Sequence, residues 1–132
     1  MKYFLPAIIW FIFIFVLCTL PGQDVPYSLW LELLAIDKWV HASIFFVLVI
    51  LLLRAMKFTY PRAAHMNFAF IALAIAIPYG GLLEIMQGAF FTGRSADLYD
   101  FIADSFGAVC GVLLYRKLAA RWEYFQQNGA DL

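Results

Sequence analysis

Three aspartates and two glycines form a regular stripe in the last third of the chain. Asp97, Asp100, Asp104, Gly107 and Gly111 are separated by 3, 4, 3 and 4 residues, which is the spacing of one face of a helix. The first part of this face is acidic. The second is Gly-x-x-x-Gly, which lets another helix approach closely. The stripe therefore predicts a helix face that points into a helical bundle and carries its carboxyl groups inward.

Further polar groups interrupt two other apolar stretches. Asp37 and His41 are four residues apart with Lys38 beside them, and Glu84 and Gln87 are three apart, so each pair shares a helix face. Histidine can serve as a general base, and carboxylates can hold a divalent cation. These residue types therefore favour either proton transfer or binding of a polar or cationic group.

Two other positions complete the set of candidate residues. Arg94 precedes the acidic stripe in a short polar connection, and a guanidinium binds phosphate oxygens in a planar, bidentate geometry. Gly80 follows Pro78 and Tyr79 and would again allow a neighbouring helix to come close.

The composition is that of a membrane protein. Of 132 residues, 65% are hydrophobic and 14% are charged, against about 45–50% and about 25% in soluble domains. Nine Lys and Arg balance nine Asp and Glu, so the basic excess of a nucleic-acid binder is missing. We exclude a disordered chain, a disulfide scaffold and a general nucleic-acid binder. We predict one all-α integral membrane domain over residues 1–132.

Four apolar runs predict a bundle of four transmembrane helices, because a bilayer core requires roughly 20 apolar residues per helical span. The predicted spans cover about residues 3–20, 37–54, 68–91 and 98–116. A short helix at 28–36 is expected to lie in the membrane interface, with Trp30 as its anchor. The first run has no small-x-small cleavage site before Pro21, so we interpret it as a retained span and not as a signal peptide.

The Lys and Arg residues predict the orientation. With the N-terminus in the cytoplasm, only Lys38 and Arg94 lie outside. The predicted inside set is Lys2, Arg54, Lys57, Arg62, Arg116, Lys117 and Arg121. This distribution favours a multi-pass protein of the cytoplasmic (inner) membrane with both termini cytoplasmic.

In this topology the polar groups converge in one layer of the outer half of the membrane. The inner halves of the spans carry few polar side chains, whereas a channel needs a polar lining through its full depth. We therefore expect a cavity open to the outside or to the outer leaflet. With His41 neutral, two cations face five carboxylates, so protonation of some groups or a bound cation must offset the buried negative charge.

The chain resembles the VanZ-like family. The matching elements are Asp37-Lys38-x-x-His41, Tyr79-Gly80-x-x-x-Glu84-x-x-Gln87, Arg94, and Asp100-x-x-x-Asp104-x-x-Gly107-x-x-x-Gly111. The family pattern usually has Asn where this chain has Asp104. The family takes its name from a protein associated with teicoplanin resistance, so the resemblance implies a role in the cell envelope or with lipid-linked glycans. It implies no established catalytic activity.

Three hypotheses follow for the polar layer. In the first, which we favour, it recognises the head group of a membrane lipid or a lipid-linked envelope precursor. The predicted ligand-binding residues are Asp37, Lys38, Gln87, Arg94, Asp97, Asp100 and Asp104, and the predicted helix-packing residues are Gly80, Gly107 and Gly111. This role would link the protein to glycopeptide-antibiotic susceptibility.

In the second hypothesis the protein is a hydrolase or transferase acting on a phosphorylated lipid, with His41 as general base oriented by Asp37 or Glu84. A divalent cation held by Glu84, Asp100 and Asp104 would then neutralise the acids and bind phosphate. In the third hypothesis the charges only fix the packing of the bundle or bind a protein partner. The residues identify no cofactor, and they leave the oligomeric state open.

Overall fold

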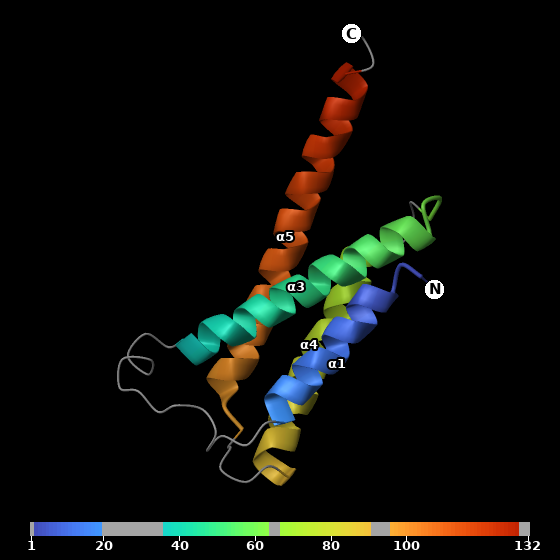
Figure 1. Cartoon of the computed structure of the whole chain (residues 1–132). Helices are drawn as coiled ribbons and strands as arrows, with labels where there is room; N and C mark the ends of the chain where they lie inside the picture. Colours follow the sequence, from blue (N-terminus) through green and yellow to red (C-terminus); the bar gives the residue numbers. More distant parts are fainter. Residues whose placement is uncertain (1, 20–35, 64–66, 91–95, 130–132) are drawn as a thin grey trace.

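The computed structural model describes residues 2–19, 36–63, 67–90 and 96–129, and the regular secondary structure in these ranges is all helical. Four helices follow one another in these ranges: α1 (Leu5–Thr19), α3 (Ile36–Thr59), α4 (Phe68–Phe90) and α5 (Leu98–Gly129) (Figure 1). The described residues contain no strand. The predicted all-α helical architecture is confirmed.

Three of these helices are long and apolar enough to cross a membrane: α3 with 24 residues, α4 with 23, and the first 23 residues of α5, Leu98–Ala120. α1 has 15 residues, which at 1.5 Å per residue is about 22 Å, shorter than a bilayer core of about 30 Å. α3 and α5 continue beyond the predicted ends at residues 54 and 116. Residues 28–35 of the predicted interfacial helix lie outside the described residues.

α3 and α5 form the most extensive helix pair and cross each other, while α1 packs on α3 and α4 (Figure 1). The crossing depends on two glycines. A Cβ at Gly107 would overlap the carbonyl oxygen of Ala42, and one at Gly111 would lie 2.8 Å from the carbonyl oxygen of Phe46. Because the two backbones nearly touch at Gly107, polar side chains just before it on α5 face polar side chains at the start of α3.

Side-chain hydrogen bonds fasten α1 to its neighbours. Trp10 Nε1 donates to the Ile44 carbonyl of α3 at 2.9 Å, and the Tyr79 hydroxyl of α4 donates to the Phe11 carbonyl at 2.8 Å. The Phe11 and Tyr79 rings also stack with centroids 3.6 Å apart. These contacts are local anchors in an otherwise apolar interface.

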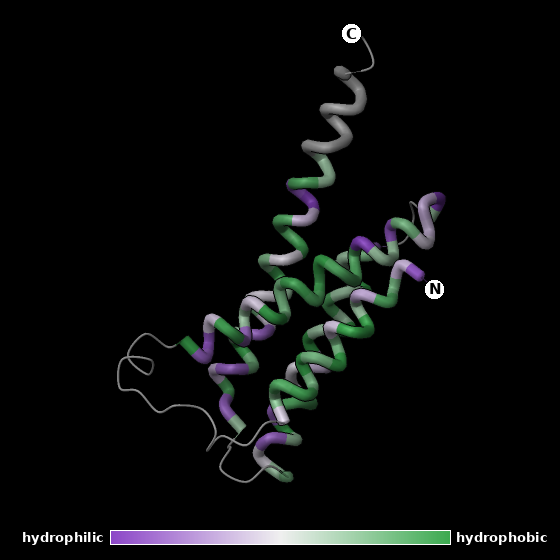
Figure 2. The backbone as a smooth tube through the Cα atoms, viewed as in Figure 1, coloured by the Kyte–Doolittle hydropathy of each residue, from purple (hydrophilic) through white to green (hydrophobic). Residues whose placement is uncertain are grey.

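The interior contains an apolar core, whose fully buried members include Ile14, Phe45, Leu48 and Val49. Large apolar side chains also cover the outside: Phe70 is 68% exposed, Ile85 66% and Leu113 60%. Figure 2 shows hydrophobic residues along most of the length of the helices. A helix that is apolar on every side suits a lipid environment, where the outward face is not in water.

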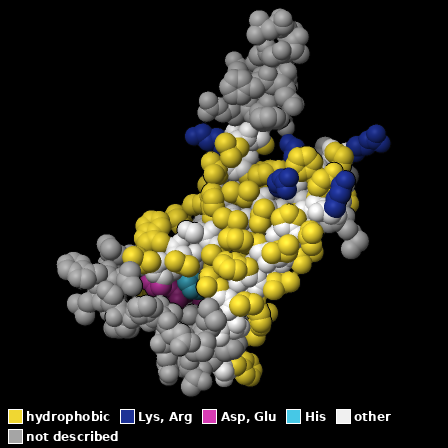
Figure 3. Space-filling view, in the orientation of Figure 1, with side chains coloured by type: hydrophobic (Ala, Val, Ile, Leu, Met, Phe, Trp, Pro, Cys, Tyr) yellow, Lys and Arg dark blue, Asp and Glu magenta, His cyan; other side chains and the backbone are white. Residues whose placement is uncertain are grey.

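The two ends of the bundle differ in charge. Lys and Arg side chains gather at the end where α3 finishes, and Asp, Glu and His side chains are visible near the opposite end, with apolar side chains between them (Figure 3). Among the described cations only Lys38 belongs to the second end. The arrangement matches the charge asymmetry in the sequence, and the direction in which the bundle crosses a membrane stays a prediction.

Candidate functional site

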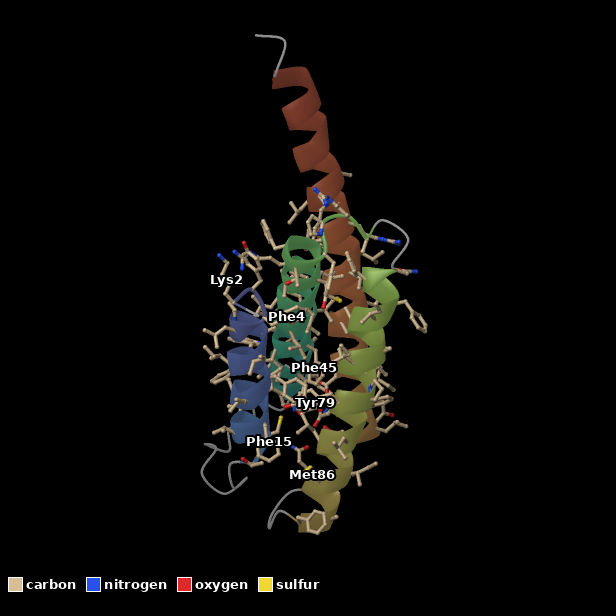
Figure 4. The ribbon with its side chains drawn as sticks, turned by 90° about the vertical axis from the view of Figure 1, so that its right-hand side faces the viewer. Lys2, Phe4, Phe15, Phe45, Tyr79 and Met86 are labelled. Carbon is tan, nitrogen blue, oxygen red and sulfur yellow. The ribbon has the colours of Figure 1, made fainter. Side chains whose placement is uncertain are left out.

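Three helices deliver polar side chains to the same end of the bundle. Lys38 and His41 lie near the start of α3, Asp100 and Asp104 near the start of α5, and Glu84 near the end of α4. Successive helices run in opposite directions, so these positions meet one to two turns inside the helix ends. In Figure 4 side-chain oxygen and nitrogen atoms lie between the helices just below the level of Tyr79. We call Asp37, Lys38, His41, Glu84, Asp97, Asp100 and Asp104 the polar layer.

Lys38 forms ion pairs with three carboxylates in the outer part of the polar layer. Its ammonium bonds to carboxylate oxygens of Asp97 at 2.8 Å, Asp100 at 2.6 Å and Asp37 at 3.0 Å. An ammonium has three donor hydrogens, so these bonds use its full capacity. Lys38 therefore ties the start of α3 to the start of α5 and is not free to bind a phosphate.

His41 and Asp104 form the buried part of the α3–α5 contact. His41 Nδ1 lies 3.0 Å from Asp104 Oδ1, and His41 Nε2 lies 3.9 Å from Asp100 Oδ2. Asp104 is 1% exposed and His41 is 8% exposed. Gly80 of α4 makes room for this aspartate, since a Cβ at Gly80 would lie 3.0 Å from Asp104 Oδ2.

Glu84 connects α4 to Asp97, the residue that precedes α5. Its Oε2 accepts a hydrogen bond from the Asp97 backbone N–H at 2.9 Å. Asp97 Oδ1 in turn accepts from the Tyr99 N–H at 2.8 Å, which is the geometry of a helix N-cap. The Lys38 ammonium, together with the Tyr99 N–H, holds the pKa of the Asp97 carboxyl below its usual range.

The polar layer has more acceptors than the described residues can satisfy. Five of its members are carboxyl residues, and Lys38 is its one ammonium among the residues described. Glu84 Oε1 and Asp104 Oδ2 are buried and have no hydrogen-bond partner within the described ranges. Buried polar atoms nearly always have a partner, so these two oxygens call for a donor or a cation from beyond the described residues.

A family model described as VanZ/LLP1 matches residues 3–120, about nine-tenths of the chain. The chain belongs to the VanZ/LLP1 family. The resemblance inferred from the motifs is thereby confirmed, and the match includes all of the motif residues. Neither the curated proteins nor the solved structures contain a match to the chain.

The VanZ/LLP1 motif residues do not all enter one cluster. Gln87 is 3% exposed, and its Nε2 donates to the Cys18 carbonyl at 3.0 Å, so it joins α4 to the end of α1. The Asp37 side chain is 59% exposed at the rim of the polar layer. Gly107 and Gly111 lie in the α3–α5 contact. Arg94 lies outside the described residues, and its role stays a prediction.

One buried polar atom was not among the predicted site residues. Ser105 Oγ, next to Asp104 on α5, is buried without a hydrogen-bond partner in the described part of the chain. Its position within an apolar run is the only signal in the sequence, and a lone serine in a span is too common to indicate a site.

Three members of the polar layer have the right proximity to bind a metal ion. His41, Glu84 and Asp104 each offer a ligand atom, and these atoms lie within 4.8 Å of one another. The set shares Glu84 and Asp104 with the predicted group of Glu84, Asp100 and Asp104, and it has His41 in place of Asp100.

A pocket lies at the opposite, basic end of this VanZ/LLP1 bundle, away from the polar layer. Its volume is about 310 Å³, and it opens between α3, α4 and α5. Its lining is Leu53, Lys57, Asn67, Phe68, Ala69, Tyr115, Arg116, Ala119 and Ala120. None of these belongs to the family motifs, so we place the candidate site at the buried carboxyl groups.

Proposed function

We propose that this VanZ/LLP1 protein binds the polar head group of a membrane lipid or of a lipid-linked envelope precursor in its polar layer. The observation that carries the proposal is the pair of buried oxygens, Glu84 Oε1 and Asp104 Oδ2, which have no hydrogen-bond partner among the described residues. Polar groups inside membrane spans are costly and are usually retained for function.

The acidic excess defines what such a head group must supply. Sugar hydroxyls or an ammonium group would donate to the unpaired carboxyl oxygens, and the lipid-exposed apolar faces would hold the acyl or prenyl chain. A phosphate needs a different partner, since Lys38 already bonds to three carboxylates. We assign that part to Arg94 on the basis of its residue type and its place before the acidic stripe.

Arg94→Ala separates binding from a purely structural role. We expect native mass spectrometry of gently extracted wild-type protein to show a selective phospholipid or polyprenyl adduct. Arg94→Ala should lose the adduct and keep the wild-type melting temperature, and Arg116→Ala, the same change at the basic end, should keep both. An absent adduct, or equal adducts on all three proteins, would contradict the proposal. An early-melting Arg94→Ala without any adduct would favour the structural alternative.

The inferred link to glycopeptide susceptibility is tested in cells. A host strain that makes the wild-type protein should differ from the same strain with Arg94→Ala in its growth inhibition by teicoplanin. Equal inhibition of the two strains, at equal protein levels, would remove this part of the proposal and leave lipid binding untouched.

A second candidate function is favoured by the His41–Asp104 pair. The Nδ1–Oδ1 distance of 3.0 Å orients the imidazole, as a carboxylate does for a general base. The activity would be hydrolysis of, or transfer from, a phosphorylated lipid. If the adduct lipid is turned over by the wild-type protein, His41→Gln should abolish turnover. Undiminished turnover would exclude His41 as the base.

A further inference from the structure

The innermost part of the polar layer consists of one imidazole and two carboxyl groups from three different helices. His41 of α3, Glu84 of α4 and Asp104 of α5 are 8%, 5% and 1% exposed, and their ligand atoms lie within 4.8 Å of one another. Because the three titratable side chains belong to three separate helices, they meet only where α3, α4 and α5 pack together. They are not a run of acids on one exposed helix face.

Two of the oxygens in this group are left without a bond. Glu84 Oε1 and Asp104 Oδ2 have no hydrogen-bond partner in the described ranges, although the other oxygen of each carboxyl group has one. Leaving a buried acceptor unpaired costs about 1–3 kcal/mol, and more for a charged group. If these residues served only to pack the helices together, apolar residues of similar volume would stabilise the bundle as well or better.

No described Lys or Arg is available to neutralise the carboxylates of Glu84 and Asp104. The ammonium of Lys38 is bonded to Asp37, Asp97 and Asp100, and the other described Lys and Arg residues belong to the opposite end of the bundle. A charged imidazole would balance only one of the two carboxylates. An ion of charge +2 would balance both.

We propose that His41, Glu84 and Asp104 bind one divalent transition-metal ion, of which Mn²⁺ and Zn²⁺ are the probes we choose. One imidazole nitrogen with carboxylate oxygens is a donor set of such ions, whereas Ca²⁺ and Mg²⁺ prefer oxygen alone. With bonds of about 2.0–2.2 Å, two ligand atoms of one ion lie roughly 3–4 Å apart, the larger value for atoms on opposite sides of the ion. The three groups, whose ligand atoms lie within 4.8 Å of one another, would therefore draw closer together on binding it.

Neighbouring groups lie against the three ligands. The Asp97 backbone N–H donates to Glu84 Oε2, and Asp100 Oδ2 lies 3.9 Å from His41 Nε2. A hydrogen bond of the first kind fixes the direction of a metal ligand, and the Asp100–His41 pair would have to shorten to form one. Gly80 contributes through its missing side chain, because a Cβ there would lie 3.0 Å from Asp104 Oδ2.

Three protein ligands leave coordination positions open, as in metal sites that bind a substrate. The role that we assign to the ion rests on the proposed head-group function. An open coordination position of the ion would take a phosphate oxygen of the lipid. The acidic layer could then bind a phosphorylated head group that its carboxylates alone would repel. Binding of the ion itself requires no lipid.

The test uses the full chain in detergent, stripped with EDTA and titrated with MnCl₂ or ZnCl₂ alone. We expect calorimetry and native mass spectrometry to show one ion per chain. Glu84→Gln and Asp104→Asn should each weaken the affinity at least tenfold. Asp131→Asn, the same chemical change near the end of the sequence and outside the polar layer, should bind as the wild type does. No stoichiometric ion, or equal binding by all four proteins, would overturn the proposal.

Two measurements keep the outcome clear. If Glu84→Gln and Asp104→Asn do not fold, the wild-type melting temperature decides: it should rise with Mn²⁺ or Zn²⁺ and return with EDTA, and no rise would overturn the proposal. Lipid adducts are scored separately in EDTA and in metal. Ion binding without any lipid adduct supports the metal site and defeats the head-group function. A lipid adduct that is equally strong in EDTA and in metal, without a bound ion, supports the head-group function and defeats the metal site.

Discussion

Lys38 determines how the outer part of the polar layer holds together. Its single ammonium faces three carboxylates at 2.6–3.0 Å, so it offsets repulsion between groups that belong to α3 and α5. Without it, Asp97 and Asp100 would have no described Lys or Arg nearby. Its contribution is partly screened, because the Lys38 side chain is 28% exposed.

Lys38→Met should therefore destabilise the bundle. Removing one partner of a fully buried pair costs about 3–5 kcal/mol. We expect roughly 1–3 kcal/mol here because of that exposure. Thermal unfolding in detergent measures the change, with Lys117→Met at the basic end as the control. A variant that melts with the wild type would show that the three ion pairs contribute no net stability.

The Asp97 carboxyl is expected to make the stability of the folded protein depend on pH. Lys38 lowers the pKa of Asp97 in the folded protein, so the unfolded chain binds this proton more readily. The resulting stability is complete above the unfolded pKa of about 3.9 and is lost as the pH falls through the lower, folded pKa.

The measurement compares wild type with Asp97→Asn, in EDTA, from pH 7 to pH 3. Asn keeps an acceptor at the helix N-cap but removes the titrating carboxyl. Below about pH 4 the melting temperature of the wild type should fall more steeply than that of the variant. Parallel curves would mean that the Lys38–Asp97 bond does not favour the folded state.

The crossing of α3 and α5 is the element contact on which the candidate site depends. A Cβ at Gly107 would overlap the Ala42 carbonyl oxygen, which belongs to the α3 backbone and cannot rotate away. The two helices would have to separate. His41, next to Ala42, and Asp104, about one turn before Gly107, would separate with them.

Gly107→Ala should consequently destabilise the bundle by at least the 1–3 kcal/mol typical of overpacking. Gly81→Ala is the matched control, since its Cβ would meet the Phe101 ring at an ordinary 3.4 Å. Both are glycine-to-alanine changes inside helices and gain the same helix propensity. Equal unfolding temperatures for the two variants would contradict the close approach of α3 and α5.

The attachment of α1 to α4 can be tested at Tyr79. Tyr79→Phe removes the hydroxyl that donates to the Phe11 carbonyl and leaves the stacked ring in place. We expect a loss of about 1 kcal/mol, the usual net value of one hydrogen bond. Tyr99→Phe, at a side chain that is 69% exposed, should change stability by less than about 0.5 kcal/mol. Chemical denaturation in mixed micelles compares the two.

At the level of the whole molecule, charge is segregated along the bundle. The basic end and the polar layer lie at opposite ends, with an apolar girdle between them (Figure 3). If the basic end faces the cytoplasm, as the Lys and Arg distribution predicts, the polar layer faces the outer leaflet and its head groups.

A reporter that is active only outside the cytoplasm tests this orientation. Fused after Leu132, it should be silent, and fused within the predicted outer connection at Gly93 it should be active. A protein made with the opposite orientation would reverse the two signals and place the polar layer in the inner leaflet. The head-group proposal would then have to be restated for inner-leaflet lipids.

Much of this protein could be predicted from local patterns. Hydropathy located the helices, because burial of apolar surface in lipid depends on composition and length alone. The stripe from Asp97 to Gly111 indicated an inward face, because helical spacing is a property of the backbone. The ordered motifs indicated the family, which the match over residues 3–120 confirms.

The partners of the polar residues could not be predicted in this way. Lys38 and Asp100 are 62 residues apart, and His41 and Asp104 are 63 apart. Which of them meet depends on the rotation and crossing of α3 and α5 about Gly107, a property of packing that no local pattern contains. Only the packed bundle shows that Lys38 is fully bonded, that the Asp97 backbone holds one oxygen of Glu84, and that two buried carboxyl oxygens have no partner among the described residues.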